Sequence, residues 1–201
     1  MRKNKTDEIL VDINPAKPEL GKRAVTFTKE IFIEQDDFML DPPGKYFRLC
    51  PAKEVRLKGA YFVKYASCEK DEDGNITKIH CTYDPETKGG NAPDGRKVKE
   101  TIHWVSKENS VDATVNLYDR LFLVENPSDE DANGEFSSNL NPESLTVLTG
   151  CKIEKDLASS NPEKKYQFMR QGYFCADITS TQDNPVFNRT VALKDSWAKK
   201  K

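Results

Sequence analysis

Apolar and polar residues alternate along several short stretches of this chain, and little of it shows the 3.6-residue period of an amphipathic helix. Apolar residues stand two positions apart at Ile31 and Ile33, Val55 and Leu57, Ile102 and Trp104, Val115 and Leu117, and Val191 and Leu193. In a strand, such alternation sends one set of side chains into a core and the other into water. The pattern predicts half-buried strands in antiparallel sheets.

Turn signals separate these stretches. Asp73-Gly74-Asn75 lies between the strand-like segments 61–68 and 76–83, and glycine accepts the positive φ of a tight turn, so a hairpin is expected there. Short helices are expected at 141–145, where asparagine precedes proline, and near 35–40. Many short strands at close spacing favour a β-barrel or β-sandwich architecture.

Two proline-containing segments predict the domain organisation. Asp41-Pro42-Pro43-Gly44 resembles a hinge, and Asn126-Pro127, followed by an acidic run, resembles a second one. The segment between them, residues 45–125, is therefore a candidate unit inserted into another unit. On this interpretation the outer unit is discontinuous and consists of residues 1–44 plus 126–201.

Composition narrows the class of protein. The chain has 201 residues, 36% of them hydrophobic and 32% charged, which suffices for a folded core with much polar surface. No apolar run approaches the ~18 residues of a membrane-spanning helix, and the N-terminus lacks the apolar region of a secretion signal. The five cysteines form no CxxC pair, so reduced thiols in an intracellular protein are expected.

Residues that could support catalysis are scarce. The two histidines, His80 and His103, both lie in strand-like segments, and no recurring spacing of histidine and cysteine predicts a zinc site. Neither a phosphate-binding GxxxxGK[ST] loop nor a GxGxxG turn occurs. We therefore expect no catalytic residue and no metal ligand in this chain, which is typical of a binding module.

The net charge of −2 conceals one basic and one acidic segment. Residues 45–65 contain six basic residues and one acid, and residues 125–143 contain six acids and no base. The basic segment also contains aromatic residues, among them Tyr46, Phe47, Tyr61 and Phe62. Cations that bind phosphates and aromatic rings that stack on unpaired bases favour single-stranded RNA as a partner. The alternative is an ordinary strand with its aromatic residues in the core.

A weaker candidate lies in segment 166–173. Along a strand, Gln167 and Arg170 would point to opposite faces, so both could contact one base only if the chain bends near Gly172.

Eight short motifs, in order along the chain, resemble the C-terminal half of the glutaminyl-tRNA synthetase family of class I aminoacyl-tRNA synthetases. They are KEVRL at 53–57, CTYD at 81–84, DGRKVK at 94–99, IHWVS at 102–106, LYDRLF at 117–122, NPESL at 141–145, GYFC at 172–175 and FNRTV at 187–191. The likeness runs from about residue 17 to residue 199. It implies an anticodon-binding region whose Rossmann catalytic half, with its HIGH-type and KMSKS-type motifs, lies upstream.

The resemblance implies a fold and a division of labour. The expected fold is all-β, with two six-stranded-type β-barrels like ribosomal protein L25 and short helices. Residues 1–44 plus 126–201 would form the proximal barrel and residues 45–125 the distal one. The whole enzyme would be a glutamine-specific ligase, and this chain alone would be inactive because it lacks the catalytic half.

The resemblance also implies a set of tRNA anticodon-binding residues. Arg48 matches the arginine that reads the third anticodon base, Gln167 and Arg170 match residues at the middle and third bases, and Arg56 and Lys58 fall at the first base. The full expected set is Arg48, Gln167, Arg170, Arg56, Lys58, Tyr46, Lys45 and Ser196. Three positions depart from bacterial relatives: Lys58 replaces an arginine, Lys45 stands where those relatives often have glutamine, and Phe47 replaces a lysine. A lysine lacks the planar fork of an arginine, so Lys58 weakens any bidentate contact with the first base.

Partners and cofactors follow from the same resemblance. The expected partners are the anticodon stem-loop of tRNA(Gln) and a covalently attached upstream catalytic domain, in a cytoplasmic monomer that does not contact membranes. No cofactor is expected in this chain, since ATP and Mg²⁺ would bind the catalytic domain. Three alternatives remain: a glutamyl-tRNA synthetase, disfavoured by CTYD and LYDRLF; a ribosomal L25-like protein, for which one barrel would suffice; and a β module that binds proteins.

Overall fold

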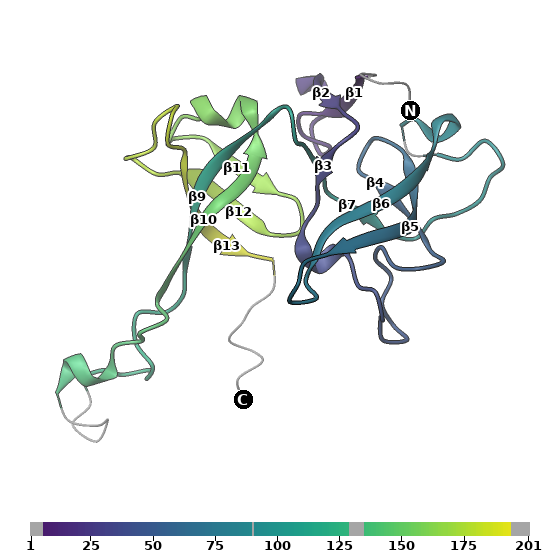
Figure 1. The fold of residues 1–201 in the computed structure, drawn as a ribbon. Helices are drawn as coiled ribbons and strands as arrows, with labels where there is room; N and C mark the ends of the chain where they lie inside the picture. Colours follow the sequence, from purple (N-terminus) through teal and green to yellow (C-terminus); the bar gives the residue numbers. More distant parts are fainter. Residues whose placement is uncertain (1–5, 90, 129–134, 194–201) are drawn as a thin grey trace. The chain divides into compact units, whose positions relative to one another are not determined.

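Strands dominate the computed structural model, which describes residues 6–89, 91–128 and 135–193 (Figure 1). Among these residues the helical segments are short 3₁₀ turns, so the prediction of an all-β protein is confirmed. The chain forms two compact units, Met1–Asn109 (unit 1) and Ser110–Lys201 (unit 2).

Unit 1 contains three small sheets. Its strands are β1 (Asp7–Asp12), β2 (Lys22–Phe27), β3 (Ile31–Phe32), β4 (Glu54–Leu57), β5 (Phe62–Lys70), β6 (Ile76–Asp84), β7 (Thr101–Ile102) and β8 (Val105–Ser106), and its 3₁₀ turns are η1 (Pro18–Leu20), η2 (Gln35–Asp37) and η3 (Pro85–Thr87). The largest sheet has the order β6-β5-β4-β7, while β1 pairs with β2 and β3 pairs with β8.

The β5–β6 hairpin has the turn that the sequence predicts. Gly74 adopts a φ of +84°, and the side chain of Asp71 accepts hydrogen bonds from the backbone N–H groups of Asp73 and Asn75. The turn connects two nine-residue strands that pair antiparallel over most of their length.

The core of unit 1 lies beneath β4 and β5. Val55 and Leu57 of β4 are completely or almost completely buried, as their alternation predicts. Ile9 and Phe27, from β1 and β2, belong to the same core cluster, and the Phe27 ring packs edge-on against Trp104 with a centroid distance of 5.0 Å. Burial of each large apolar side chain contributes about 1.5–3 kcal/mol.

This core explains where unit 1 begins and ends. Because Ile9 and Phe27 pack with Val55, the N-terminal strands group with residues 45–109, whereas the expected division places residues 1–44 with 126–201. That expected division stays a prediction, and the units described below are those of the structure.

Unit 2 contains one five-stranded sheet. Its strands are β9 (Ser110–Tyr118), β10 (Leu145–Glu154), β11 (Lys165–Phe168), β12 (Gly172–Ala176) and β13 (Val186–Ala192), in the order β10-β9-β13-β12-β11, and its 3₁₀ turns are η4 (Phe136–Asn139) and η5 (Lys155–Ser159). Phe174 and Phe187 are the largest side chains of its core. η4, which lies between β9 and β10 in the sequence, is located away from the sheet (Figure 1).

Three details differ from the sequence-based expectations. None of the sheets in the described part of the chain closes into a barrel; β1–β2 covers the unit 1 core by side-chain packing instead of joining the main sheet. Two strand pairs, β4–β7 and β9–β13, are parallel rather than antiparallel. Residues 141–144 form a turn before β10 rather than a helix, because the Asn141 side chain accepts from the N–H of Glu143 and closes the turn locally.

Candidate nucleic-acid interface

Arg48 is held in place by η2. Its Nη1 donates to the backbone oxygen of Asp36 at 2.9 Å and lies 3.3 Å from Oδ1 of Asp37, whose side chain is only 2% exposed. The Arg48 guanidinium forms no other hydrogen bond within the described residues, so Nε and Nη2 keep donors for a ligand. The Arg48 side chain is 36% exposed, and a fixed guanidinium fork at a surface is suited to bidentate recognition.

Tyr46 binds the same backbone oxygen as Arg48. Its hydroxyl donates to the backbone oxygen of Asp36 at 3.1 Å, next to the bond from Arg48. Burial is the main cause that raises the pKa of Tyr46 to about 12, so the hydroxyl stays protonated and remains a donor at neutral pH. Lys53 donates to the backbone oxygen of Tyr46 at 2.8 Å and ties the segment to the start of β4. Lys45 is exposed at the beginning of this segment.

Arg56 lies on the face of β4 that points away from the core. Its guanidinium carbon is 5.2 Å from the centroid of the Phe62 ring, and that of Arg96 is 5.3 Å from the same ring. Phe62 is therefore 1% exposed although it points away from the core cluster, because two guanidinium groups cover it. Lys58 follows β4 with its side chain exposed, while its backbone oxygen accepts from the Trp104 indole at 3.0 Å.

Arg96 is bound by three carboxylates. It contacts Glu54 at 3.1 Å, Asp84 at 2.5 Å and Asp94 at 2.7 Å. Its guanidinium lowers the pKa of Asp84, and its backbone N–H and guanidinium lower the pKa of Asp94. This cluster fixes the segment that follows the Asp94-Gly95 turn over the outer face of β4 and β5.

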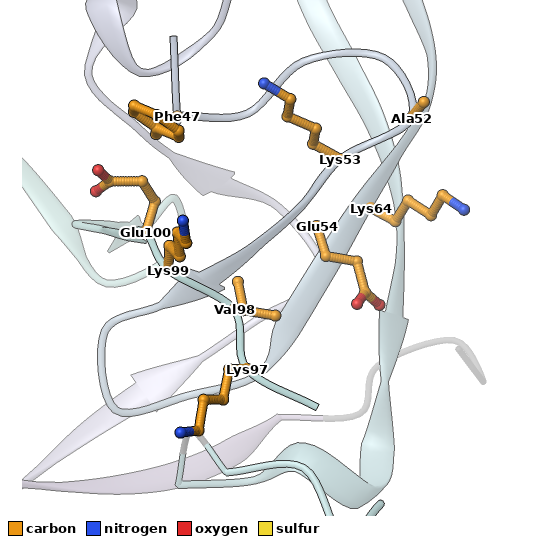
Figure 2. Close-up of a pocket in the computed structure, with 9 residues that line it drawn as sticks. All are labelled: Phe47, Ala52, Lys53, Glu54, Lys64, Lys97, Val98, Lys99 and Glu100. Carbon is orange, nitrogen blue, oxygen red and sulfur yellow. The ribbon is translucent and has the colours of Figure 1, made fainter. Parts of the chain in front are cut away.

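A hollow lies between that segment and the residues around Phe47 (Figure 2). Its cavity volume is about 360 Å³, and Lys53, Lys64, Lys97 and Lys99 are among the lining residues. Phe47 is 49% exposed, with the ammonium groups of Lys53 and Lys99 at 5.7 Å and 5.9 Å from its ring centroid. The hollow thus combines an exposed aromatic ring with several cations.

Gln167 and Arg170 belong to unit 2, in the β11–β12 hairpin. Gln167 is exposed on β11, and Arg170 is half-buried in the connecting turn with a φ of +67°. The N–H of Gln171 donates to the Phe168 oxygen at 2.9 Å and closes this turn. The chain thus reverses direction close to Gly172, where the sequence indicated that a bend is needed, and both side chains belong to one tight hairpin.

The expected site residues therefore fall into separate groups. Lys45, Tyr46 and Arg48 share one segment of unit 1, Arg56 and Lys58 lie on and after β4, and Gln167 and Arg170 share a hairpin of unit 2. Ser196 lies outside the described residues. A single RNA-binding face formed by all of them stays a prediction.

Sequence reasoning missed several residues of this region. No sequence pattern indicates the role of Asp37, because its contact with Arg48 depends on the path of an irregular segment. A sequence pattern does indicate Lys97 and Lys99, since they alternate with Val98 just after a turn. Among the aromatic residues of the basic segment, Tyr61 and Phe62 are buried, as the ordinary-strand alternative predicts, whereas Phe47 is exposed.

Two further observations concern metal sites and membrane-spanning helices among the described residues. They contain no group of three or more His, Cys, Asp or Glu side chains placed to hold a metal ion. No helix formed by them has the length and apolar character needed to cross a membrane.

Comparison with known proteins gives consistent matches. Two family models described as "tRNA synthetases class I (E and Q), anti-codon binding domain" match residues 2–84 and 101–177. The glutamine--tRNA ligase of Vibrio parahaemolyticus is 55% identical over 187 residues, which is 92% of this chain and 33% of the relative. That of Pseudomonas putida is 52% identical over 182 residues, 90% of this chain and 32% of the relative.

The chain thus spans about a third of the length of these curated relatives. The two family models between them cover most of both units and include every described residue of the expected anticodon-binding set: Lys45 to Lys58 in the first match, Gln167 and Arg170 in the second. The chain belongs to the family of anticodon-binding domains of class I tRNA synthetases specific for glutamate and glutamine (E and Q).

Proposed function

We propose that this chain binds the anticodon loop of tRNA(Gln), as the anticodon-binding part of a glutamine–tRNA ligase that attaches glutamine to this tRNA with ATP. The names of the relatives support glutamine over glutamate. On this proposal the protein works in the cytoplasm as a monomer, and ATP and Mg²⁺ bind to a catalytic domain rather than to this chain. The chain selects the tRNA, and chemistry takes place elsewhere.

The observation that carries this proposal is the fixed guanidinium of Arg48. Two acceptors on η2 hold its Nη1, so little side-chain entropy is lost when the remaining donors meet a base. A guanidinium can donate to two acceptors on a guanine edge, which distinguishes that base from the others. Tyr46 and the exposed Lys45 adjoin it on the same segment.

A binding titration tests the proposal directly. The 201-residue chain is titrated with tRNA carrying the CUG or UUG anticodon and with a tRNA whose anticodon loop is scrambled. We expect both glutamine anticodons to bind more tightly than the scrambled loop at the same salt concentration. Equal binding of all three would contradict anticodon recognition, and absence of binding at low salt would favour a protein-binding module.

Asp37→Asn is expected to reduce discrimination at the base that Arg48 reads. The neutral amide no longer attracts the Arg48 guanidinium electrostatically, so one charge-assisted contact worth about 1.5 kcal/mol weakens. Affinity for tRNA with the cognate third base should fall, by up to about tenfold, more than affinity for a swapped base. Asp36→Asn is the matched control, because Asp36 contacts Arg48 through its backbone oxygen alone. Identical behaviour of the two variants would contradict the positioning role of Asp37.

Arg170→Gly is expected to separate stability from binding. Arg170 has a φ of +67°, a left-handed conformation that costs a non-glycine residue about 1–2 kcal/mol. Glycine relieves this cost, so the free energy of unfolding in urea should stay level or rise while tRNA affinity falls. Arg170→Asn should weaken binding similarly, since asparagine also tolerates this conformation. A loss of binding that accompanies a large loss of stability would point to a structural role instead.

A further inference from the structure

The hollow beside Phe47 is built on the outer face of β4 and β5. Glu54 and Lys64, which are paired across these strands, form its floor, and the segments around Phe47 and Lys99 form two of its walls (Figure 2). Its volume of about 360 Å³ lies at the lower end of the range of small-ligand sites, which suits one nucleotide. The sequence resemblance assigns no role to this hollow.

Phe47 differs from the other aromatic residues of the basic segment. Tyr61 and Phe62 are at most 3% exposed, whereas the Phe47 ring is 49% exposed and contributes little to the core. Its faces are near two ammonium groups, at 5.7 Å and 5.9 Å, so the ring lies in a positive electrostatic environment. A nucleotide complements this environment, because its base can stack on the Phe47 ring while its negatively charged phosphate contacts the ammonium groups.

The charges of the hollow favour an anion. No carboxylate of the described residues lies within 4.0 Å of the ammonium groups of Lys64, Lys97 or Lys99, so these cations are available. Glu54, one of two acidic lining residues, is neutralised by Arg96 at 3.1 Å. Figure 2 shows the ammonium groups of Lys64 and Lys97 directed outward at the rim, where a phosphate backbone can pass.

We propose that this hollow is a binding subsite for one unpaired RNA nucleotide next to the base read by Arg48, with Phe47 stacking on its base and Lys64 and Lys97 contacting the adjoining phosphates. The proposal rests on the proposed function, since it adds a subsite to the same anticodon-loop complex. Phe47 precedes Arg48 directly in the chain, so the hollow and the Arg48 guanidinium belong to the same segment of unit 1. The subsite contributes affinity but no base preference, because every base has a face that can stack.

The test compares Phe47→Leu with Phe47→Tyr, using the full chain and an anticodon stem-loop RNA. Base–aromatic stacking is worth about 1–3 kcal/mol, so the leucine variant should bind about tenfold more weakly, while the tyrosine variant stays within about twofold of the wild type. The ratio of cognate to swapped-anticodon affinity should not change in either variant. Removal of one loop base, scanned along the RNA, should abolish the difference between the variants at a single position. Thermal unfolding verifies that both variants are folded.

The lysine contacts have their own measurement. Lys64→Gln and Lys97→Gln should each reduce the slope of log affinity against log salt by about 0.7, as expected for one phosphate on a single strand. Lys70→Gln is the matched control, because Lys70 is exposed at the opposite end of β5 and does not line the hollow. Equal slopes for all three variants would overturn the phosphate contacts.

The outcomes distinguish this inference from the proposed function. If the wild type prefers the cognate loop but the leucine and tyrosine variants bind alike, the subsite is refuted and anticodon binding stands. If the wild type binds cognate and scrambled loops equally, anticodon recognition fails, and the contrast between leucine and tyrosine on either loop still decides the subsite. If no RNA binds at low salt, both proposals are refuted.

Discussion

Arg48→Ala is expected to cost about 1–3 kcal/mol of discrimination at the base that Arg48 reads, which corresponds to roughly 5–150-fold. The reason is geometric: Asp36 and Asp37 hold Nη1 of Arg48, so the donors that remain are already oriented. The measurement is a pair of dissociation constants, one for tRNA with the cognate third anticodon base and one for tRNA in which only that base is changed. The cognate complex should weaken far more than the swapped one.

Lys64→Ala is the control for this prediction. Lys64 is exposed on β5 and lines the hollow, where it is expected to meet phosphate rather than a base edge. The substitution should weaken the binding of both tRNAs to the same extent and reduce the salt dependence of binding. If Arg48→Ala also weakens the binding of both tRNAs equally, Arg48 contacts only the RNA backbone, and its assignment as a residue that reads a base is wrong.

Gly172→Ala is expected to have the largest effect on stability. Gly172 has a φ of +143°, and a Cβ atom there would lie 2.4 Å from the backbone oxygen of Val191 on β13. Backbone strain of about 1–3 kcal/mol and steric overlap of about 1–3 kcal/mol together predict a loss of about 2–6 kcal/mol in the free energy of unfolding. Urea denaturation followed by circular dichroism measures this loss. The β12–β13 pairing and the adjacent Arg170 turn should be affected first.

Gly150→Ala separates the two causes of this loss. Gly150 also has a left-handed φ, +68°, but nothing lies within 4 Å of its Cβ position. Only the conformational cost of about 1–2 kcal/mol should therefore be seen. Equal destabilisation by the two substitutions would show that β13 moves aside and that the close approach to Val191 is unimportant.

The local part of the fold could be predicted from the sequence. Alternation at Val55 and Leu57 identified a strand and its buried face, and Asp73-Gly74-Asn75 identified the β5–β6 hairpin. Both signals depend on a few neighbouring residues. The parallel pairing of β4 with β7 could not be predicted in this way, because it joins Arg56 to Thr101 across forty-odd residues and leaves no local pattern.

The candidate site could be predicted only in part. The resemblance assigned Arg48, but not the buried Asp37 that positions it. Burial of the aromatic residues was equally hard to assign. Phe62 points away from the core yet is covered by Arg56 and Arg96, whereas Phe47 lies in an irregular segment that nothing covers fully. Whether an aromatic ring is covered depends on loops, and the alternation of apolar and polar residues does not specify the course of a loop.

The carboxylates around Arg96 also govern how this protein responds to ionic strength. The segment that carries Lys97 and Lys99 is anchored through ion pairs of Arg96, whose side chain is about one third exposed, and dissolved salt screens such pairs. Added salt therefore has two effects. It competes for the phosphates of a bound nucleic acid, and it weakens the ion pairs that hold the segment with Lys97 and Lys99 in place. The wild-type protein should accordingly release its ligand more steeply with rising salt than its count of phosphate-binding cations implies.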